Sequence, residues 1–330
     1  MTSLYPLVKN ETIKILKKKR FHVIVLVLLI LIPIFTYAQL QTAKERAKQF
    51  GTSDWRVTTQ QQIYDMTNRL GSARVPEEWK QYMAVQIQQL QYYLDHDVDP
   101  RAPSGVTFVR FFLSESVTLF IPLLVLAIAS DLVSGERSTG TIKMLLTRPV
   151  PRWKILLSKL ITLILFVSLI VTLTILLAYL IAGAVFGYDG WTMPVFTGFQ
   201  MNGTEVDTSR VHAIDQALYI VLQGGLTWFA AVVVACLAFM VSVLVRSTAA
   251  SIVIMMASII AGLILVNMAQ SWESAKYLFV VNLDLLDYLS GQLPPIEGMS
   301  LPFSMLVLGG WAIASLLVSF SVFTKQDILN

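Results

Sequence analysis

Charged residues are scarce in this chain. Only 14% of its 330 residues are charged, while 55% are hydrophobic, whereas an ordinary soluble domain has about a quarter charged residues. Uncharged apolar runs long enough to cross a bilayer recur along the whole sequence. This pattern argues against a soluble multidomain protein and indicates an integral membrane protein.

Cysteine and histidine are nearly absent. The single cysteine, Cys236, excludes an intramolecular disulfide and is expected to be a small buried apolar residue. The three histidines, His22, His96 and His212, lie near the ends of apolar runs or outside them. Neither a zinc site nor a serine–histidine pair can therefore assemble inside a membrane, which argues against an intramembrane hydrolase. We expect no catalytic residue, metal ligand or cofactor site in this chain.

The expected fold class is an all-α polytopic membrane protein, with residues 1–330 forming one domain. Residues 1–20 are expected to form an amphipathic helix on the cytoplasmic membrane surface, because apolar and basic residues alternate at helical spacing. Six transmembrane helices are predicted at residues 21–38, 109–132, 155–186, 214–245, 248–268 and 303–323.

The distribution of lysine and arginine predicts the orientation in the cell membrane. With both termini in the cytoplasm, the inner segments carry 14 basic and 4 acidic residues, a net charge of +10, and the rest carries −6, which together give the overall +4. This asymmetry has the sign that the positive-inside rule requires. Residues 39–108 are then an extracellular helical segment, either a cap over an exit pathway or a spacer against a neighbouring subunit. Residues 271–302 are expected to form an extracellular re-entrant or interfacial hairpin.

Ionisable residues inside the predicted spans are few, so a proton-coupled carrier has little support. Arg110 and Glu115, one turn and a little more apart, are candidate contacts with a substrate or a gate, or else a pair at a helix end. Gly183 and Gly187 have a spacing that permits close helix approach. Packing within the bundle and dimerisation both explain this spacing.

A basic, polar stretch at residues 131–159, DLVSGERSTGTIKMLLTRPVPRWKILLSK, separates the second and third predicted spans. Its glycines, Gly135 and Gly140, have the interval of a phosphate-binding loop. However, Thr141 and Ile142 stand where such a loop needs Lys and then Ser or Thr. The chain is therefore not expected to bind ATP by this loop.

The same stretch predicts a helix-turn-helix knob at the membrane surface. Ser134 or Gly135 can begin a short helix with Glu136 in its first turn, where a carboxylate faces the positive end of the helix dipole. Gly140 is expected to mark a bend, and Thr141 to cap the segment that follows. Its basic residues would meet either lipid head groups or acidic groups of a protein partner.

Residues 134–159 resemble the intracellular segment between the second and third spans of the type-2 ATP-binding-cassette exporter permeases. The shared pattern is a glutamate before Gly-Thr, then Leu-Leu, a basic-Pro turn and a basic residue near the next span. It is carried by Glu136, Gly140, Thr141, Leu145, Leu146, Arg148, Pro149, Arg152 and Lys159. Residues 276–291, KYLFVVNLDLLDYLSG, also resemble the external hairpin before the last span of bacterial members.

The resemblance implies a permease subunit that exports a substrate while ATP and Mg are bound by a separate cytoplasmic ATPase subunit. A second permease, identical or homologous, and membrane lipid are the other implied partners; nucleic acid is not. The alternative is a membrane scaffold or sensor subunit without transport of its own. By the resemblance, residues 131–154 form the coupling helix region, and its contacts with the ATPase subunit are Gly135, Glu136, Arg137, Ser138, Thr139, Gly140, Thr141, Lys143, Arg148 and Arg152.

Overall fold

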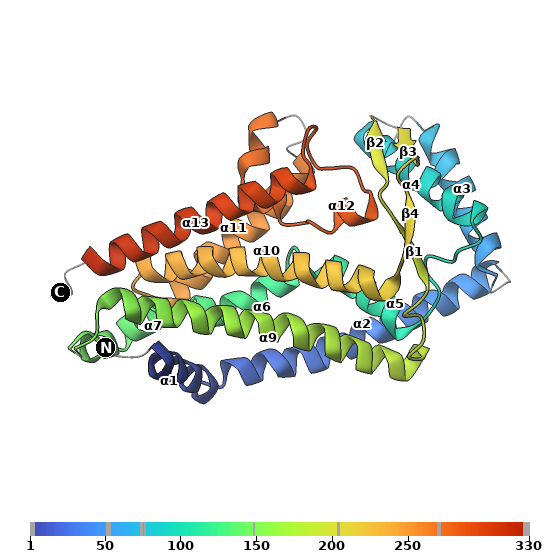
Figure 1. The fold of residues 1–330 in the computed structure, drawn as a ribbon. Helices are drawn as coiled ribbons and strands as arrows, with labels where there is room; N and C mark the ends of the chain where they lie inside the picture. Colours follow the sequence, from blue (N-terminus) through green and yellow to red (C-terminus); the bar gives the residue numbers. More distant parts are fainter. Residues whose placement is uncertain are drawn as a thin grey trace.

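The structure, a computed structural model, describes residues 4–50, 54–72, 75, 77–147, 149–202, 205–268 and 272–325. It is an elongated bundle of long helices (Figure 1). The α-helices are α1 (Leu4–Lys17), α2 (Arg20–Phe50), α3 (Trp55–Leu70), α4 (Glu77–Asp95), α5 (Gly105–Ser116), α6 (Phe120–Ala129), α7 (Ser134–Ser138), α8 (Thr141–Leu146), α9 (Arg152–Phe186), α10 (Gln216–Leu244), α11 (Thr248–Met268), α12 (Asp287–Ser290) and α13 (Leu301–Lys325).

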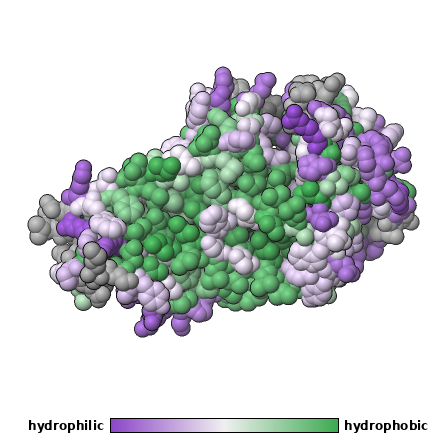
Figure 2. All heavy atoms as spheres, viewed as in Figure 1, coloured by the Kyte–Doolittle hydropathy of each residue, from purple (hydrophilic) through white to green (hydrophobic). Residues whose placement is uncertain are grey.

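Five of the described helices are long and apolar enough to cross a membrane: α2, α9, α10, α11 and α13. The pair α5 and α6 forms a sixth candidate. Figure 2 shows the consequence, an apolar belt between two hydrophilic ends. The chain is thus a mostly helical, multi-pass membrane protein. Helix α10 lies at the centre, since 72% of its apolar window is buried, against 22% for α13.

The second predicted span, residues 109–132, is a bent pair of helices and not one continuous helix. Helices α5 and α6 meet at an angle of 65°. Pro122 lies in the first turn of α6. It has no N–H to donate to the Thr118 carbonyl, and its ring occupies the space that this carbonyl would need in a continuous helix. The break therefore falls just before α6.

Close backbone contact fixes α5 against α9. The backbone N–H of Gly105 donates to the Gly187 carbonyl at 2.8 Å. A Cβ on Gly105 would lie 2.8 Å from Gly183 Cα, which leaves no room for a side chain. The small residues at 183 and 187 thus serve packing within this chain.

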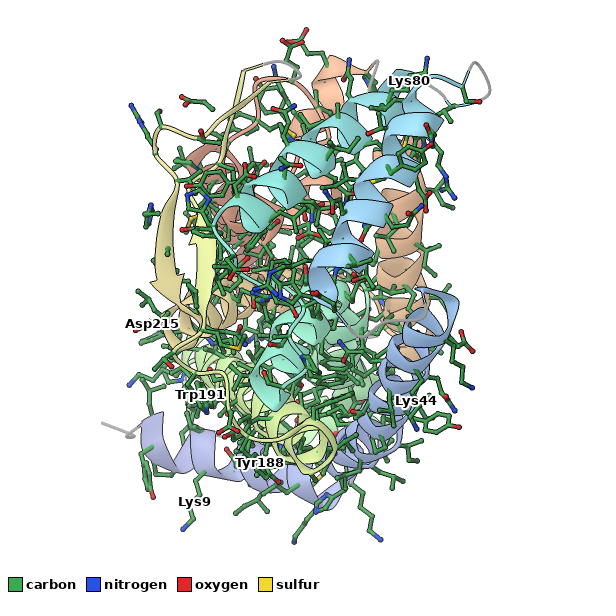
Figure 3. The ribbon with its side chains drawn as sticks, turned by 90° about the vertical axis from the view of Figure 1, so that its right-hand side faces the viewer. Lys9, Lys44, Lys80, Tyr188, Trp191 and Asp215 are labelled. Atoms are coloured by element: carbon green, nitrogen blue, oxygen red, sulfur yellow. The ribbon has the colours of Figure 1, made fainter. Side chains whose placement is uncertain are left out.

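The end of the bundle that carries α3 and α4 is here called the hairpin end, and Figure 3 looks onto it with these two helices in front. They form the helical element expected over residues 39–108. The all-α expectation is incomplete, because four short strands also lie here. β1 (Pro194–Thr197) pairs antiparallel with β4 (His212–Asp215), and β2 (Gln200–Asn202) with β3 (Glu205–Asp207).

These strands are too short to have a clear alternating pattern in the sequence, and tertiary contacts hold them. The backbone N–H of Phe196 donates to the Tyr93 hydroxyl of α4 at 3.3 Å. The rings of Phe196 and Tyr93 meet edge to face with centroids 5.0 Å apart. Gly198, with φ of +88°, takes the left-handed conformation after β1 that glycine permits.

The segment between α11 and α13 folds back onto both helices. It contains two 3₁₀ helices, η1 (Glu273–Tyr277) and η2 (Phe279–Asn282), followed by α12. The Trp311 indole N–H of α13 donates to the Tyr277 carbonyl at 2.8 Å, and the hydroxyls of Tyr288 and Ser304 lie 2.8 Å apart. Leu285 is completely buried in the main core. The segment is therefore packed into the bundle.

Candidate functional site

The other end of the bundle is here called the basic end, and both ends of the chain lie there together with α1 and α7 (Figure 1). Helices α7 and α8, residues 134–146, form the predicted knob. Helix α7 begins at Ser134, one of the two predicted starts, and α8 begins with Thr141, the residue expected to cap it. Between them Gly140 has φ of +72°, a conformation that glycine adopts without strain. The knob is thus two short helices joined by a tight bend.

The inner side of the knob is held by a charge cluster of Glu11, Lys14, Glu136 and Lys159. Lys159 Nζ lies 2.7 Å from Glu11 Oε2 and 2.9 Å from Glu136 Oε1. Lys14 Nζ lies 2.7 Å from Glu11 Oε1 and 2.8 Å from Glu136 Oε1. The two carboxylates and two ammonium groups balance in charge. The cluster therefore joins three elements, α1, α7 and α9.

Burial makes this charge cluster more than a surface ion pair. The side chain of Lys159 is 1% exposed and that of Glu136 is 9% exposed. Burial alone would raise the pKa of Glu136, but Lys159 and Lys14 outweigh it and hold this pKa below its usual value of 4.5. Burial alone would lower the pKa of Lys14, yet Glu11 and Glu136 hold it above 10.5. Both groups therefore stay charged over the physiological range.

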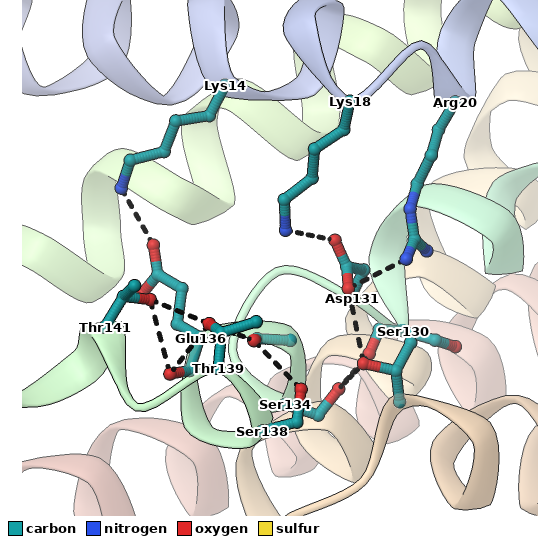
Figure 4. Close-up of polar contacts among 12 residues, drawn as sticks. Lys14, Lys18, Arg20, Ser130, Asp131, Ser134, Glu136, Ser138, Thr139 and Thr141 are labelled. Atoms are coloured by element: carbon teal, nitrogen blue, oxygen red, sulfur yellow. Dashed lines mark hydrogen bonds and ion pairs between the residues drawn. The ribbon is translucent and has the colours of Figure 1, made fainter.

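A second ionic contact joins the start of α2 to the segment before the knob (Figure 4). Asp131, 7% exposed, lies 2.6 Å from Lys18 Nζ and 2.9 Å from Arg20 Nη2. Lys19, between these two cations, has φ of +58° where α1 turns into α2. A non-glycine residue in this conformation costs free energy and needs support from its surroundings. The ion pairs on either side provide that support.

Hydroxyl groups attach the knob to α10 and α11. Ser242 Oγ of α10 accepts hydrogen bonds from the backbone N–H groups of Val133 and Ser134 at 3.2 and 3.0 Å, and donates to the Ser130 carbonyl at 2.9 Å. Thr248 of α11 donates to Asp131 at 3.2 Å. The beginning of α7 is therefore fixed from two sides.

The outer side of the knob is open to solvent. Ser138, Thr139, Gly140 and Thr141 are exposed. Met144 on α8 is 74% exposed, although methionine is an apolar residue. Methionine is flexible and polarisable and is frequent at adaptable binding surfaces, which makes Met144 a candidate contact residue. The knob thus combines a fixed inner side with an exposed outer side.

The predicted contact residues divide between these two sides. Gly135 and Glu136 are buried within this chain, and Glu136 faces the cationic side chains of α1 and α9. Arg137 is half-buried. Arg152 donates to the Thr324 carbonyl of α13 at 3.2 Å. The Lys143 side chain and the whole of Arg148 lie outside the described residues.

Sequence reasoning did not assign the partners of Glu136. Glu11 is the single acid among the charged residues of α1, and Lys159 stands within an otherwise apolar part of α9. An isolated charge in an apolar run needs a buried partner. This signal singles out Lys159 but not Glu11, which stands among polar residues of α1, and it cannot pair the two.

Arg110 and Glu115 do not form the predicted helix-end pair. Five residues on one helix place their side chains about 140° apart around its axis. Arg110 is buried and donates to the Pro100 carbonyl. Glu115 is exposed and acts electrostatically on Asp284 and Asp287. The two residues therefore have separate surroundings. Among the described residues, no group of three or more His, Cys, Asp or Glu is placed to hold a metal ion.

The apolar spans and charged ends define a multi-pass membrane protein. More particularly, the chain belongs to the family described as "Protein of unknown function (DUF2705)", which matches residues 78–329. It is similar to two proteins of Bacillus subtilis (strain 168). "Uncharacterized protein YhcI" is 26% identical over 80% of this chain and 89% of the relative. "Uncharacterized membrane protein YdbK" is 29% identical over 64% of this chain and 80% of the relative.

Proposed function

We propose that this chain is the membrane permease subunit of an ATP-driven exporter of the type-2 ATP-binding-cassette class. In this proposal the basic end faces the cytoplasm of the cell, and the hairpin end faces outward. Two copies, or one copy and a homologous permease, pair with two ATPase subunits that bind ATP and Mg. The permease itself provides the pathway for the substrate.

The observation that carries this proposal is the two-sided construction of the knob. Its outer side offers a bend of small polar residues and the exposed Met144. Its inner side is joined to α1 and α9 through Glu136. A partner that moves the outer side would therefore move α9, a candidate span of 35 residues, as a rigid lever. A docking helix needs this connection in order to convert closure of an ATPase dimer into tilting of the spans.

Charge supports the same orientation. Lys14, Lys18 and Arg20 lie with the knob at the basic end, and the polar bond network there is drawn in Figure 4. Positively charged ends of membrane proteins stay in the cytoplasm. A cytoplasmic ATPase could then reach the knob directly.

The test compares two exposed apolar residues at opposite ends of the molecule. Met144 of the knob is 74% exposed and Trp79 of α4 is 58% exposed. We expect Met144→Glu to abolish co-purification with an ATPase subunit and the ATP hydrolysis of the purified complex. Trp79→Glu, the matched control, should leave both unchanged. Because both side chains project from the surface, neither change should disturb the fold.

Sidedness is tested separately with a cysteine at Ser138. A membrane-impermeant thiol reagent should label the Ser138→Cys variant in inside-out vesicles and not in intact cells. Labelling from outside would refute the orientation. A wild-type permease that purifies without any nucleotide-hydrolysing subunit would instead favour the scaffold or sensor alternative.

A further inference from the structure

A cavity of about 210 Å³ lies at the hairpin end, between α4, α5, β1 and α10. Its wall contains Tyr93 of α4, Phe196 of β1 and Tyr219 of α10. Its polar lining includes Arg110 of α5 and Gln223 of α10, together with Arg101 and several further glutamine and serine side chains. Aromatic side chains combined with placed polar groups are typical of small-molecule sites.

Arg110 is a buried cation without a carboxylate partner among the described residues. It is 9% exposed, and its guanidinium donates to the Pro100 carbonyl. Its other contacts are with aromatic faces, 5.2 Å from the Phe111 ring centre and 6.0 Å from that of Tyr219. Asp99 acts on it electrostatically, but Asp99 Oδ1 accepts a hydrogen bond from the Arg101 backbone at 2.9 Å. One carbonyl uses only part of the five N–H donors of arginine.

Gln223 supplies a second, independent signal at the same cavity. It is 2% exposed, and its Oε1 has no hydrogen-bond partner among the described residues. Its Nε2 donates to the Arg110 carbonyl at 3.5 Å, which orients the amide beside α5. A buried acceptor without a donor is costly and rare. Two neighbouring helices thus present polar groups with unsatisfied hydrogen-bonding capacity to one cavity.

We propose that this cavity binds the anionic group of a ligand, a carboxylate or a phosphate, with Arg110 as its counter-ion. The planar guanidinium binds both anions through two parallel hydrogen bonds. Gln223 Oε1 accepts from a hydroxyl or amine beside the anionic group, and the aromatic wall contacts the apolar part of the ligand. The anion is carried either by a lipid head group or by a small soluble molecule.

A neighbouring cavity provides room for the rest of such a ligand. It has about 350 Å³ and shares Phe111 and Arg101 with the first in its lining. Pro103 and Phe186 also line it, so its wall includes apolar surface. An amphiphilic anion could therefore extend from the Arg110 cavity into the second one. This inference does not depend on the exporter proposal, because it concerns binding without an ATPase or ATP.

The experiment measures binding to the purified full chain in detergent, without ATPase and without nucleotide. Three anionic probes are each compared with an uncharged or non-binding counterpart: benzoate with benzamide, dioleoylphosphatidylglycerol with dioleoylglycerol, and inorganic phosphate with chloride at equal ionic strength. We expect at least one anionic probe to bind and its counterpart not to bind. The lipid arm and the two soluble arms identify the source of the anion.

Variants then test Arg110 and Gln223. Arg110→Met should weaken binding of that probe at least tenfold, and Gln223→Leu by a smaller factor, since it keeps the counter-ion. The matched control is Arg56→Met, which removes an exposed arginine of α3 and should leave the affinity unchanged. Elution as a single folded species in size-exclusion chromatography confirms that each variant is intact. The proposal is refuted if no anionic probe binds more tightly than its counterpart. It is also refuted if the folded Arg110→Met and Gln223→Leu variants both bind the probe with wild-type affinity.

Discussion

The two ends of this protein treat a buried cation in opposite ways. At the basic end, Lys159 is 1% exposed and contacts the carboxylates of Glu11 and Glu136. At the hairpin end, Arg110 is 9% exposed and contacts one carbonyl and two aromatic rings. A buried charge is expensive unless it is paired. The first cation is neutralised within the chain, whereas the second is available to a ligand.

From this difference we infer different roles for the two ends. The charge cluster of Glu11, Lys14, Glu136 and Lys159 fixes the knob to α1 and α9, so it acts as a joint. The Arg110 cavity leaves polar groups unfulfilled between rigid helices, which is a preorganised binding site. In the proposed exporter, the joint receives the movement of the ATPase and the cavity receives a ligand at the far end.

The largest expected effect follows from removing the paired cation. Lys159→Met leaves Glu11 and Glu136 buried with Lys14 as their shared partner, and breaking a buried ion pair costs about 3–5 kcal/mol. Thermal unfolding of the purified protein in detergent should show this loss as a lower midpoint. Lys9→Met, which removes an exposed lysine of α1, is the control and should not change the midpoint. Equal stability of both variants would show that the cluster is not a joint.

The next largest expected effect is a dependence of the protein's stability on pH. The pKa of Glu136 in the folded protein lies below 4.5, so its contribution to stability is complete above pH 4.5 and is lost as the pH falls through the folded value. The pKa of Lys14 lies above 10.5, so its contribution is complete below pH 10.5 and is lost as the pH rises through the folded value. The charge cluster should therefore contribute its full stabilisation between pH 4.5 and pH 10.5.

Difference curves isolate these contributions from other titrations. We compare midpoints of thermal unfolding at each pH. The midpoint of wild type minus that of Glu136→Gln should fall at acid pH. The midpoint of wild type minus that of Lys14→Met should fall at alkaline pH. Both differences should be constant near neutrality. Each loss should be smaller than that of Lys159→Met, because Glu11 remains as a partner for the lysines when Glu136 is neutral. A difference that changes most near pH 7 would contradict the assignment.

The smallest expected effect is that of removing the unpaired cation. Arg110→Met replaces a buried charge that lacks a carboxylate by an apolar side chain, which is neutral or stabilising in many proteins. It also leaves the Pro100 carbonyl without its donor, at a cost of about 1–3 kcal/mol. We expect the two terms to nearly cancel, so that the unfolding midpoint stays within a few degrees of wild type. A loss as large as that of Lys159→Met would make Arg110 a structural residue.

Local patterns predicted much of the basic end. Helix α1 lies within residues 1–20, α7 begins at Ser134 and the bend lies at Gly140, as the sequence predicts. The direction of Glu136 could not be predicted, because its partner Lys14 is 122 residues away and the contact of Glu11 with Lys159 spans 148 residues. Helical periodicity describes only neighbours within a few turns. The prediction therefore located the knob but not the partners of its carboxylate.

The sequence by itself determined that this protein is a helical membrane protein with a basic knob between two apolar segments, because hydropathy, charge and turn residues act locally. Only the tertiary structure decided which charges are buried and which are paired. It also decided that Arg110 and Gln223 face one cavity, although 113 residues separate them. Pairing and burial depend on how distant helices pack, and no local pattern contains that information.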